Sequence, residues 1–198
     1  MTVRRLNAGF LSDSELDAMG VCDAKNRNIL VHSTAVIVNF DDIFFGENIR
    51  IDPYTVISCK NLVLGNHVHI ATGCGLFGRA TISMGDFSTI SGHGLIYSSS
   101  DDYSGKALTN PTVPADFTSV KHAEVVIGRH CVIGARSTLL PGSQLEEGAA
   151  VGSSSLVIGT LPQWSISVGI PAKPIKSRTR DCLEHELTLE QWRQDQDV

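Results

Sequence analysis

The sequence lacks any run of about 18 apolar residues, the length that a membrane-spanning helix requires, so we expect no transmembrane segment. Its first twenty residues contain no apolar run of signal-peptide length, which predicts a protein that is not secreted. The net charge of −5 gives no electrostatic reason to bind nucleic acid or a membrane surface. We therefore expect a cytoplasmic protein without nucleic-acid partners or membrane insertion.

Paired cysteines are also missing. The five cysteines are widely spaced, with no CxxC pair to suggest a zinc site or a redox motif: Cys22, Cys59, Cys74, Cys131 and Cys182. Free thiols of this kind behave as small hydrophobic residues in a reducing compartment. We expect them to be buried, and we expect no metal site.

What the sequence does contain is a period of six residues. From residue 127 an aliphatic residue recurs at every sixth position: Ile127, Ile133, Leu139, Leu145, Val151 and Val157. The fifth position of each hexad is small or bears a thiol: Cys131, Ser137, Ser143, Ala149 and Ser155. The period also occurs upstream, interrupted by shifts of one or two residues, as between Ile82 and Met84, that we interpret as loops bulging from a corner.

A period of six fits neither an amphipathic helix nor an alternating strand. It is typical of a solenoid whose triangular rung consists of three short strands and about 18 residues. The alternative is a β-sandwich with short strands and regular turns. The 198 residues, 42% of them hydrophobic and 18 of them glycine, predict one all-β solenoid domain over residues 25–176. A long loop, residues 97–124, interrupts the repeat and is either functional or a mobile surface loop.

The two flanking segments differ from the repeat. In residues 1–24, Ser12 and Glu15 form a capping box, which predicts a short helix over about residues 12–19. In residues 177–198, Leu183 and Leu187 lie on one face of a predicted helix over 181–192 that ends in a polar tail. We expect both segments to cap the open ends of the solenoid.

Three features together resemble a known family: the hexads, the DDYSG…TNPTVP loop and the segment WSISVGIPAKPIKSR. Over residues 25–178 the chain resembles the left-handed β-helix acyltransferases of the hexapeptide-repeat superfamily. It is similar to sugar O-acetyltransferases of the galactoside and maltose type and to acyltransferases of surface-polysaccharide biosynthesis. The resemblance implies a homotrimer that binds acetyl-CoA in a groove between subunits and acts on a sugar or nucleotide-sugar acceptor.

The catalytic base departs from the pattern of that family. Galactoside-type enzymes use a histidine in a Gly-His-Pro loop motif, and a gapless alignment of the hexads brings it onto Asp101, within Ser100-Asp101-Asp102. Three possibilities remain: Asp101 or Asp102 acts as the base, His69 acts with Asp101 as its orienting carboxylate, or another histidine (His93 or His122) enters the site. By the same alignment Arg79 lies at an acceptor-binding position, and the loop residues Ser100 and Tyr103 are further acceptor-binding candidates.

The resemblance also implies a coenzyme A site. Ala135 and Ser153 match small residues whose backbone contacts the pantetheine arm in similar enzymes. Ile158 and Gly159 match a Thr-Lys pair there, so a side-chain contact is missing. Lys173 and Lys176 match basic residues near the nucleotide phosphates, where ammonium groups supply mobile point charges.

We therefore predict an acetyl-CoA-dependent O-acetyltransferase that acts on a sugar hydroxyl. The alternative is an N-acetyltransferase for a nucleotide-linked amino sugar, because an amine needs less help from a base. Two further alternatives belong to other functional classes: a non-catalytic binding solenoid and a carbonic anhydrase-like metalloprotein. The latter requires about three convergent imidazoles, for which His67, His69 and His93 are the candidates.

Overall fold

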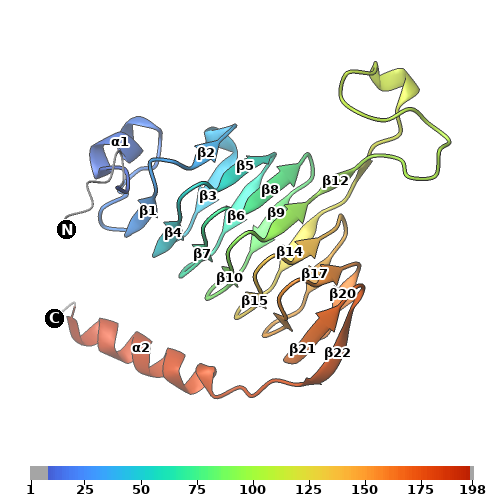
Figure 1. Cartoon of the computed structure of the whole chain (residues 1–198). Helices are drawn as coiled ribbons and strands as arrows, with labels where there is room; N and C mark the ends of the chain where they lie inside the picture. Colours follow the sequence, from blue (N-terminus) through green and yellow to red (C-terminus); the bar gives the residue numbers. More distant parts are fainter. Residues whose placement is uncertain (1–8, 197–198) are drawn as a thin grey trace, which may run out of the picture.

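The computed structural model describes residues 9–196 and shows a parallel left-handed β-helix with three walls (Figure 1). The first wall is an eight-stranded sheet: β1 (Ile29–Val31), β4 (Ile49–Ile51), β7 (His69–Ile70), β10 (Thr89–Ile90), β15 (Val132–Ile133), β18 (Ala150–Val151), β21 (Ser165–Gly169) and β22 (Ala172–Ser177). The second wall has six strands: β2 (Val36–Ile37), β5 (Val56–Cys59), β8 (Gly75–Gly78), β11 (Leu95–Tyr97), β16 (Thr138–Leu139) and β19 (Leu156–Val157). The third wall also has six: β3 (Ile43–Phe45), β6 (Leu62–Leu64), β9 (Ile82–Met84), β14 (Val125–Ile127), β17 (Gln144–Leu145) and β20 (Thr160–Leu161). The predicted all-β solenoid is confirmed.

The chain visits the walls in a fixed order, and this defines three corners. The first corner joins the first wall to the second and includes residues 52–55, 71–74, 91–94, 134–137 and 152–155. The second corner joins the second wall to the third and carries the long loop, which begins and ends with the antiparallel strands β12 (Ser99–Ser100) and β13 (Lys121–His122). The third corner joins the third wall to the first and includes residues 65–68, 85–88, 128–131, 146–149 and 162–164.

The repeated aliphatic residues fill the interior of the coil. Every aliphatic residue of the hexads from Ile127 to Val157 is at most 3% exposed. The small fifth position is buried at the corners, where Ser137 Oγ donates a hydrogen bond to the Gly152 carbonyl at 2.9 Å. A small hydroxyl therefore satisfies a corner carbonyl that no strand partner reaches, which explains why larger residues are absent there.

The interpretation of the frame shifts as corner loops is wrong where the repeat shifts by two. Ile82 and Met84 are both buried and belong to one strand, β9, with Ser83 between them facing outward. Because side chains alternate along a strand, residues two apart face the same side, so the extra pair lengthens the third wall. The β14 strand shows the same pattern, with Val125 and Ile127 both buried.

The cysteines follow the prediction in part. Cys59, Cys74 and Cys131 are buried, and burial raises the pKa of Cys59 and of Cys131 to about 11, so these thiols stay protonated at neutral pH. Cys22 is exposed and Cys182 is half-buried, which differs from the expectation. Both lie in the flanking segments, outside the repeat that buries the other three.

The N-terminal segment closes one end of the coil. The helix α1 (Asp13–Ala18) has the predicted capping box: the Ser12 amide donates to Glu15 Oε2 at 2.7 Å, and the Glu15 amide donates to Ser12 Oγ. Leu16 is fully buried, and the Leu11 amide donates to the Val31 carbonyl beside β1. The predicted segment 1–24 begins outside the described residues, which start at residue 9.

The C-terminal helix does not cap the other end, contrary to expectation. The helix α2 (Cys182–Gln196) runs back along the coil (Figure 1). It contacts the third corner through Glu186, which is 7% exposed and accepts hydrogen bonds from Arg129 and from His130 Nε2. A buried carboxylate requires such partners, so polar pairing places this helix. The strand β22 instead pairs antiparallel with β21 at the edge of the first wall.

Stacked rings line the third corner beneath α2. His67 stacks on Phe87 with ring centroids 4.5 Å apart, Phe87 on His130 at 5.2 Å, and His130 lies 5.9 Å from Trp164. Gly148 occupies the intervening rung with a φ of +71°, and a Cβ there would lie 2.4 Å from the Trp164 ring. The missing side chain lets Trp164 reach across one rung and close the stack.

We expect the thermal unfolding midpoint to fall as the pH is lowered from about 7.5 to about 5.5. Burial, aided by Arg193, lowers the pKa of His67, and burial, aided by Arg129, lowers the pKa of His130. In the unfolded chain the same imidazoles have a pKa near 6.5, so they bind protons at a pH at which the folded protein keeps them neutral. The contribution is therefore complete above about pH 6.5 and is lost below that value.

Circular dichroism melts across this pH range test the expectation. Asparagine tolerates the left-handed backbone at both positions, so the double variant His67→Asn, His130→Asn should flatten the pH dependence. His185→Gln, at an exposed position of α2, is the matched control and should leave it unchanged. A midpoint that does not depend on pH in the unaltered protein contradicts the prediction.

Candidate functional site

The first corner is built from small residues in register. Asp52, Ala71, Ser91, Gly134 and Gly152 follow directly after paired strand residues and form one row along the corner. A Cβ on Gly134 would lie 2.5 Å from the Ser153 amide nitrogen, so the rungs meet closely at this row. In this row the rungs therefore meet with little side-chain bulk between them, while Tyr54, His93 and Arg136 are exposed elsewhere at the same corner.

The next row along the same corner contains two of the predicted coenzyme A residues. Ala135 and Ser153 lie one rung apart, and the Ser154 amide donates to the Ala135 carbonyl at 2.8 Å. Ala135 is half-buried and Ser153 is exposed. At Ala135 and Ser153 an extended thioester arm would meet the backbone and small side chains, with the exposed Arg136 beside it.

A polar cluster on the first wall adjoins the same corner. The Arg50 Nε donates to Asp52 Oδ1 at 2.7 Å, and His69 Nε2 lies 2.9 Å from Asp52 Oδ2. The other ring nitrogen of His69, Nδ1, faces Thr89 Oγ1 at 3.4 Å. Burial opposes ionisation of Asp52, but the hydrogen bonds from His69 and Arg50 outweigh it and lower the pKa of that carboxyl.

His69 therefore has a different carboxylate partner from the one that sequence comparison suggested. Asp52, not Asp101, contacts its imidazole, because the pairing of Ile51 with Ile70 brings residues 17 positions apart side by side. Asp101 lies in the loop at the second corner, and no hydrogen bond joins it to His69 among residues 9–196. The structure thus separates the two predicted catalytic residues within one chain.

The loop at the second corner uses its two aspartates differently. The Asp102 carboxylate accepts backbone hydrogen bonds from Ser104, Lys106 and Ala107, all within 3.0 Å, and side-chain and backbone hydrogen bonding with Ser104 lowers its pKa. In the described part of the chain no such partner is found for the exposed Asp101 carboxylate. Asp102 therefore shapes the turn, whereas Asp101 is available for a ligand.

The remaining acceptor-binding candidates lie at the root and tip of the loop. The Arg79 amide donates to Ser99 Oγ at 2.8 Å, and Ser99 Oγ lies 2.7 Å from His122 Nδ1, which fixes the root. Ser100 Oγ donates to the Asp101 carbonyl. Tyr103 is 95% exposed. The loop projects away from its own solenoid, as Figure 1 shows.

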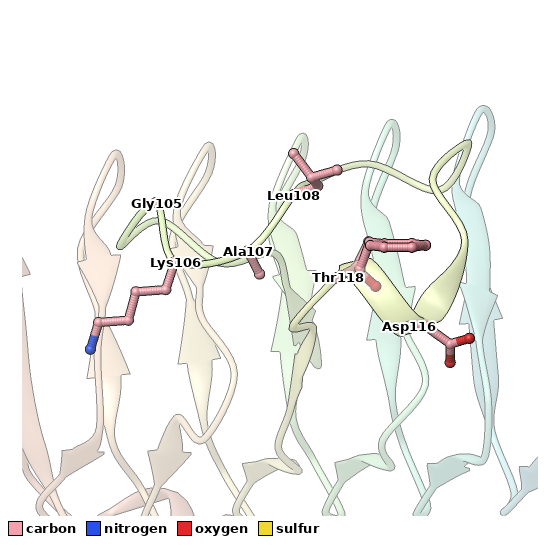
Figure 2. A pocket seen from close by; sticks show the side chains of 7 residues that line it. Gly105, Lys106, Ala107, Leu108, Asp116 and Thr118 are labelled. Atoms are coloured by element: carbon pink, nitrogen blue, oxygen red, sulfur yellow. The ribbon is translucent and has the colours of Figure 1, made fainter.

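The loop also encloses a hollow of about 460 Å³, drawn in Figure 2. Its lining comes only from the loop: Gly105, Lys106, Ala107, Leu108, Asp116, Phe117 and Thr118. The Lys106 and Asp116 side chains point away from each other in Figure 2. None of the predicted catalytic or coenzyme A residues lines this hollow.

The other predicted coenzyme A residues lie elsewhere. Ile158, 60% exposed, and Gly159 lie at the second corner, on the opposite side of the second wall from Ala135 and Ser153. Lys173 and Lys176 lie exposed on β22, at the edge of the first wall. One chain therefore divides these residues between two corners and the end of the coil.

The described residues form no candidate metal site. Residues 9–196 contain no group of three histidine, cysteine, aspartate or glutamate side chains that could hold an ion. His67 lies at the third corner, His69 on the first wall and His93 at the first corner, so they do not converge within a chain. No helix between residues 9 and 196 has the length and apolar character needed to cross a membrane.

Comparisons with known proteins identify relatives of this chain. No protein-family model matches the chain. It is 35% identical over 179 residues to the dTDP-4-amino-4,6-dideoxy-D-glucose acyltransferase of Escherichia coli, covering 89% of this chain and 93% of that one. It is 32% identical over 158 residues to the putative lipopolysaccharide biosynthesis O-acetyl transferase WbbJ of Escherichia coli K12, covering 74% and 78%.

A solved structure has the same fold over nearly the whole length of this chain. The N-acyltransferase AntD from Bacillus cereus, in complex with dTDP and 3-hydroxybutyryl-CoA, is 37% identical and superposes with a TM-score of 0.87, covering 94% of this chain and 98% of that one. Other structures of the same protein, with coenzyme A and dTDP or dTDP-4-amino-4,6-dideoxyglucose, carry a replacement of one aspartate or one serine.

Proposed function

Because the chain belongs to the sugar acyltransferases of the hexapeptide-repeat superfamily, we propose that it transfers an acyl group from a coenzyme A thioester to the amino group of a nucleotide-linked amino sugar. The observation that carries this proposal is the near-complete agreement with an N-acyltransferase that binds coenzyme A and a dTDP-linked amino sugar. A product of this kind suits surface-polysaccharide biosynthesis, and the thioester substrate suits the cytoplasm.

The spacing of two residues supports Asp101 as the catalytic group. The serine and the aspartate replaced in the Bacillus cereus relative lie ten residues apart. In this sequence only one serine is followed ten residues later by an aspartate, and the pair is Ser91 and Asp101. Ser91 lies on the open first corner, and Asp101 is the loop carboxylate without an internal partner.

The chemistry fits a carboxylate. An amine acceptor is protonated at neutral pH and must lose a proton before its nitrogen attacks the thioester carbonyl. A carboxylate binds the ammonium group by a charge-assisted hydrogen bond and receives that proton. In this proposal Arg79, Ser100 and Tyr103 bind the acceptor beside Asp101.

The proposed site needs a second copy of the chain. Ala135, Ser153 and Ser91 lie at the first corner, whereas Asp101 and the Ile158-Gly159 pair lie at the second. Both groups meet one acyl-coenzyme A only if the second corner of one copy faces the first corner of the next. A closed ring of three copies provides this arrangement, so we propose a homotrimer.

The two exposed lysines of β22 provide a separate test. We expect Lys173→Ala or Lys176→Ala to raise the KM for acetyl-CoA about 3- to 10-fold with little change in kcat, because a phosphate contact remote from the thioester contributes equally to ground and transition states. Initial-rate kinetics measure both constants. Lys25→Ala, at another exposed lysine, is the control.

The sharper comparison for the lysines uses two acyl donors. Acetyl-pantetheine carries the same thioester without the nucleotide phosphates, so both variants should use it as well as the unaltered protein does. Equal KM values for acetyl-CoA in the variants and the unaltered protein would remove these lysines from the site.

The proposal itself is tested with matched acceptors. A dTDP-linked 4-amino-4,6-dideoxyhexose and its 4-hydroxy counterpart are incubated with acetyl-CoA, free thiol is followed with a thiol reagent, and the products are identified by mass spectrometry. Acylation of the amino sugar is the expected result. Binding of acetyl-CoA without acylation of either sugar would favour the non-catalytic alternative.

A further inference from the structure

The outward face of the first wall carries polar side chains at only a few rungs. The outward residues in register along this wall are Leu30, Arg50, His69, Thr89, Val132, Ala150 and Ile166. Arg50, His69 and Thr89 are consecutive, and the residues on both sides of them are aliphatic or small. Polar groups that are isolated on an otherwise apolar sheet face need hydrogen-bond partners, and here they supply these to one another.

The partners of His69 fix which ring nitrogen carries the proton. Both oxygens of Asp52 are engaged, Oδ1 by Arg50 and Oδ2 by His69, and Asp52 is only 8% exposed. An ionised carboxylate accepts hydrogen bonds and donates none, so a neutral His69 must carry its hydrogen on Nε2. The lone pair then lies on Nδ1, the nitrogen that faces Thr89 and the outer surface.

The contact with Thr89 leaves this nitrogen available. The Nδ1–Oγ1 distance of 3.4 Å is longer than a strong hydrogen bond, and the His69 side chain remains 42% exposed. A ligand hydroxyl approaching the wall can therefore replace the threonine as the partner of Nδ1. The arrangement has the base and orienting carboxylate of a catalytic triad, with the place of the nucleophile open to a substrate.

The cluster lies at the same corner as the proposed acyl donor, on rungs that precede Ala135 and Ser153. Asp52 occupies the same corner row as Ser91, two rungs away, which is about 10 Å at the usual spacing of neighbouring strands. Ala135 lies at the next corner position one rung beyond Ser91. The imidazole is thus two rungs before Ala135, near one end of the row along which the thioester arm is proposed to lie.

We propose that Asp52, held by Arg50, is a positioning residue that keeps Nδ1 of His69 as a proton acceptor, and that this pair gives the site a second acceptor class, sugar hydroxyls. The inference rests on the proposed acyl transfer. The hydroxyl oxygen attacks the thioester carbonyl, its proton moves to Nδ1, the C–O bond forms and the C–S bond breaks. The leaving thiolate then takes the proton from the imidazolium.

A hydroxyl needs this help more than an amine does. Its oxygen becomes a good nucleophile only as the proton leaves, and a positioned base contributes about 10²- to 10⁴-fold to such a step. An amine that has lost its ammonium proton already has a nucleophilic lone pair. The two acceptors should therefore respond differently when His69 or Asp52 is replaced.

Matched sugars on the full-length protein test the inference. With the 4-hydroxy sugar, His69→Gln and Asp52→Asn should lower kcat at least about 100-fold, while acylation of the amino sugar changes less than about 10-fold. Asp52→Glu should restore part of the lost rate. Asp86→Asn is the matched control, because Asp86 accepts from the Asn66 amide at the third corner and should leave both rates unchanged.

A second readout does not depend on activity. In ¹⁵N spectra of the imidazoles, the His69 signal, assigned by its loss in His69→Gln, should show hydrogen on Nε2 in the unaltered protein. Asp52→Asn should yield a mixture of the two tautomers, whereas Thr89→Val should not change the tautomer. Hydrogen on Nδ1 in the unaltered protein would overturn the inference even if a variant failed to fold.

The outcomes separate this inference from the proposed function. If the amino sugar is acylated and the hydroxy sugar is not, the inference fails and the proposed function stands. If the hydroxy sugar is acylated equally by His69→Gln, the inference also fails. If neither sugar accepts an acyl group, the proposed function fails, and with it the role given to His69.

Discussion

Asp101→Asn should lower kcat for the amino sugar about 100- to 10,000-fold, the range for loss of a positioned proton acceptor. The amide keeps the size of the carboxylate and can still hydrogen-bond to a sugar, but it neither attracts an ammonium group nor takes its proton. The KM for acetyl-CoA should stay within a few-fold of the original value, because the loop carboxylate is proposed to contact the acceptor and not the thioester. Steady-state kinetics with a dTDP-linked 4-amino sugar measure both constants.

Two other loop aspartates serve as controls. Asp116→Asn, at an exposed position, should leave turnover unchanged. Asp102→Asn should loosen the turn, because Asp102 accepts three backbone hydrogen bonds, and faster tryptic cleavage at Lys106 would reveal this. Turnover within about 5-fold of normal in Asp101→Asn would remove Asp101 from the reaction, since a true base contributes at least about 10²-fold.

The fold could be predicted because its repeat is short and strict. Residues such as Ile133 and Leu139 each occupy one inward position, and a period of six has few structural explanations. The sequence pattern failed where a rung departs from that period, as between Ile82 and Met84, because strand lengthening and corner insertion shift the frame by the same amount. Only strand pairing distinguishes the two.

The partner of His69 was hidden for a related reason. Asp52 precedes His69 by 17 residues, and the two meet because this rung spans 19 residues, from Ile51 to its paired Ile70. An average rung of 18 residues does not fix the neighbour of a particular outward residue. Given the pairing, Arg50 and Thr89 could have been identified as outward neighbours of His69, and their polarity would have marked the cluster.

The placement of α2 could not be predicted from its apolar residues. Leu187, one of the two leucines that suggested a buried helix face, is 60% exposed. The helix is instead held by Glu186 against Arg129 and His130, which lie 57 and 56 positions earlier in the chain. Such pairing of polar groups leaves no periodic signal in the sequence.

The proposal that each site needs a second copy leads to the prediction that most directly tests the site. Asp101→Asn removes the loop carboxylate, and Ala135→Trp fills the corner row that the thioester arm needs. Each variant alone should retain about 1% of normal activity or less. When the two chains are co-expressed in equal amounts and all trimers are purified together, activity should recover, because in the proposed trimer the intact loop of one copy faces the intact corner of another.

Random mixing in equal amounts should leave about a quarter of the sites with both parts intact, since each site draws one part from each of two chains in a closed ring. A site contained within one chain gives no recovery, because every chain carries one defect. A chain with both substitutions, mixed equally with the unaltered chain, is the control: shared sites again give about a quarter of normal activity, whereas self-contained sites give about half. Ala135→Ser should remain active, which shows that the loss in Ala135→Trp comes from bulk at the corner.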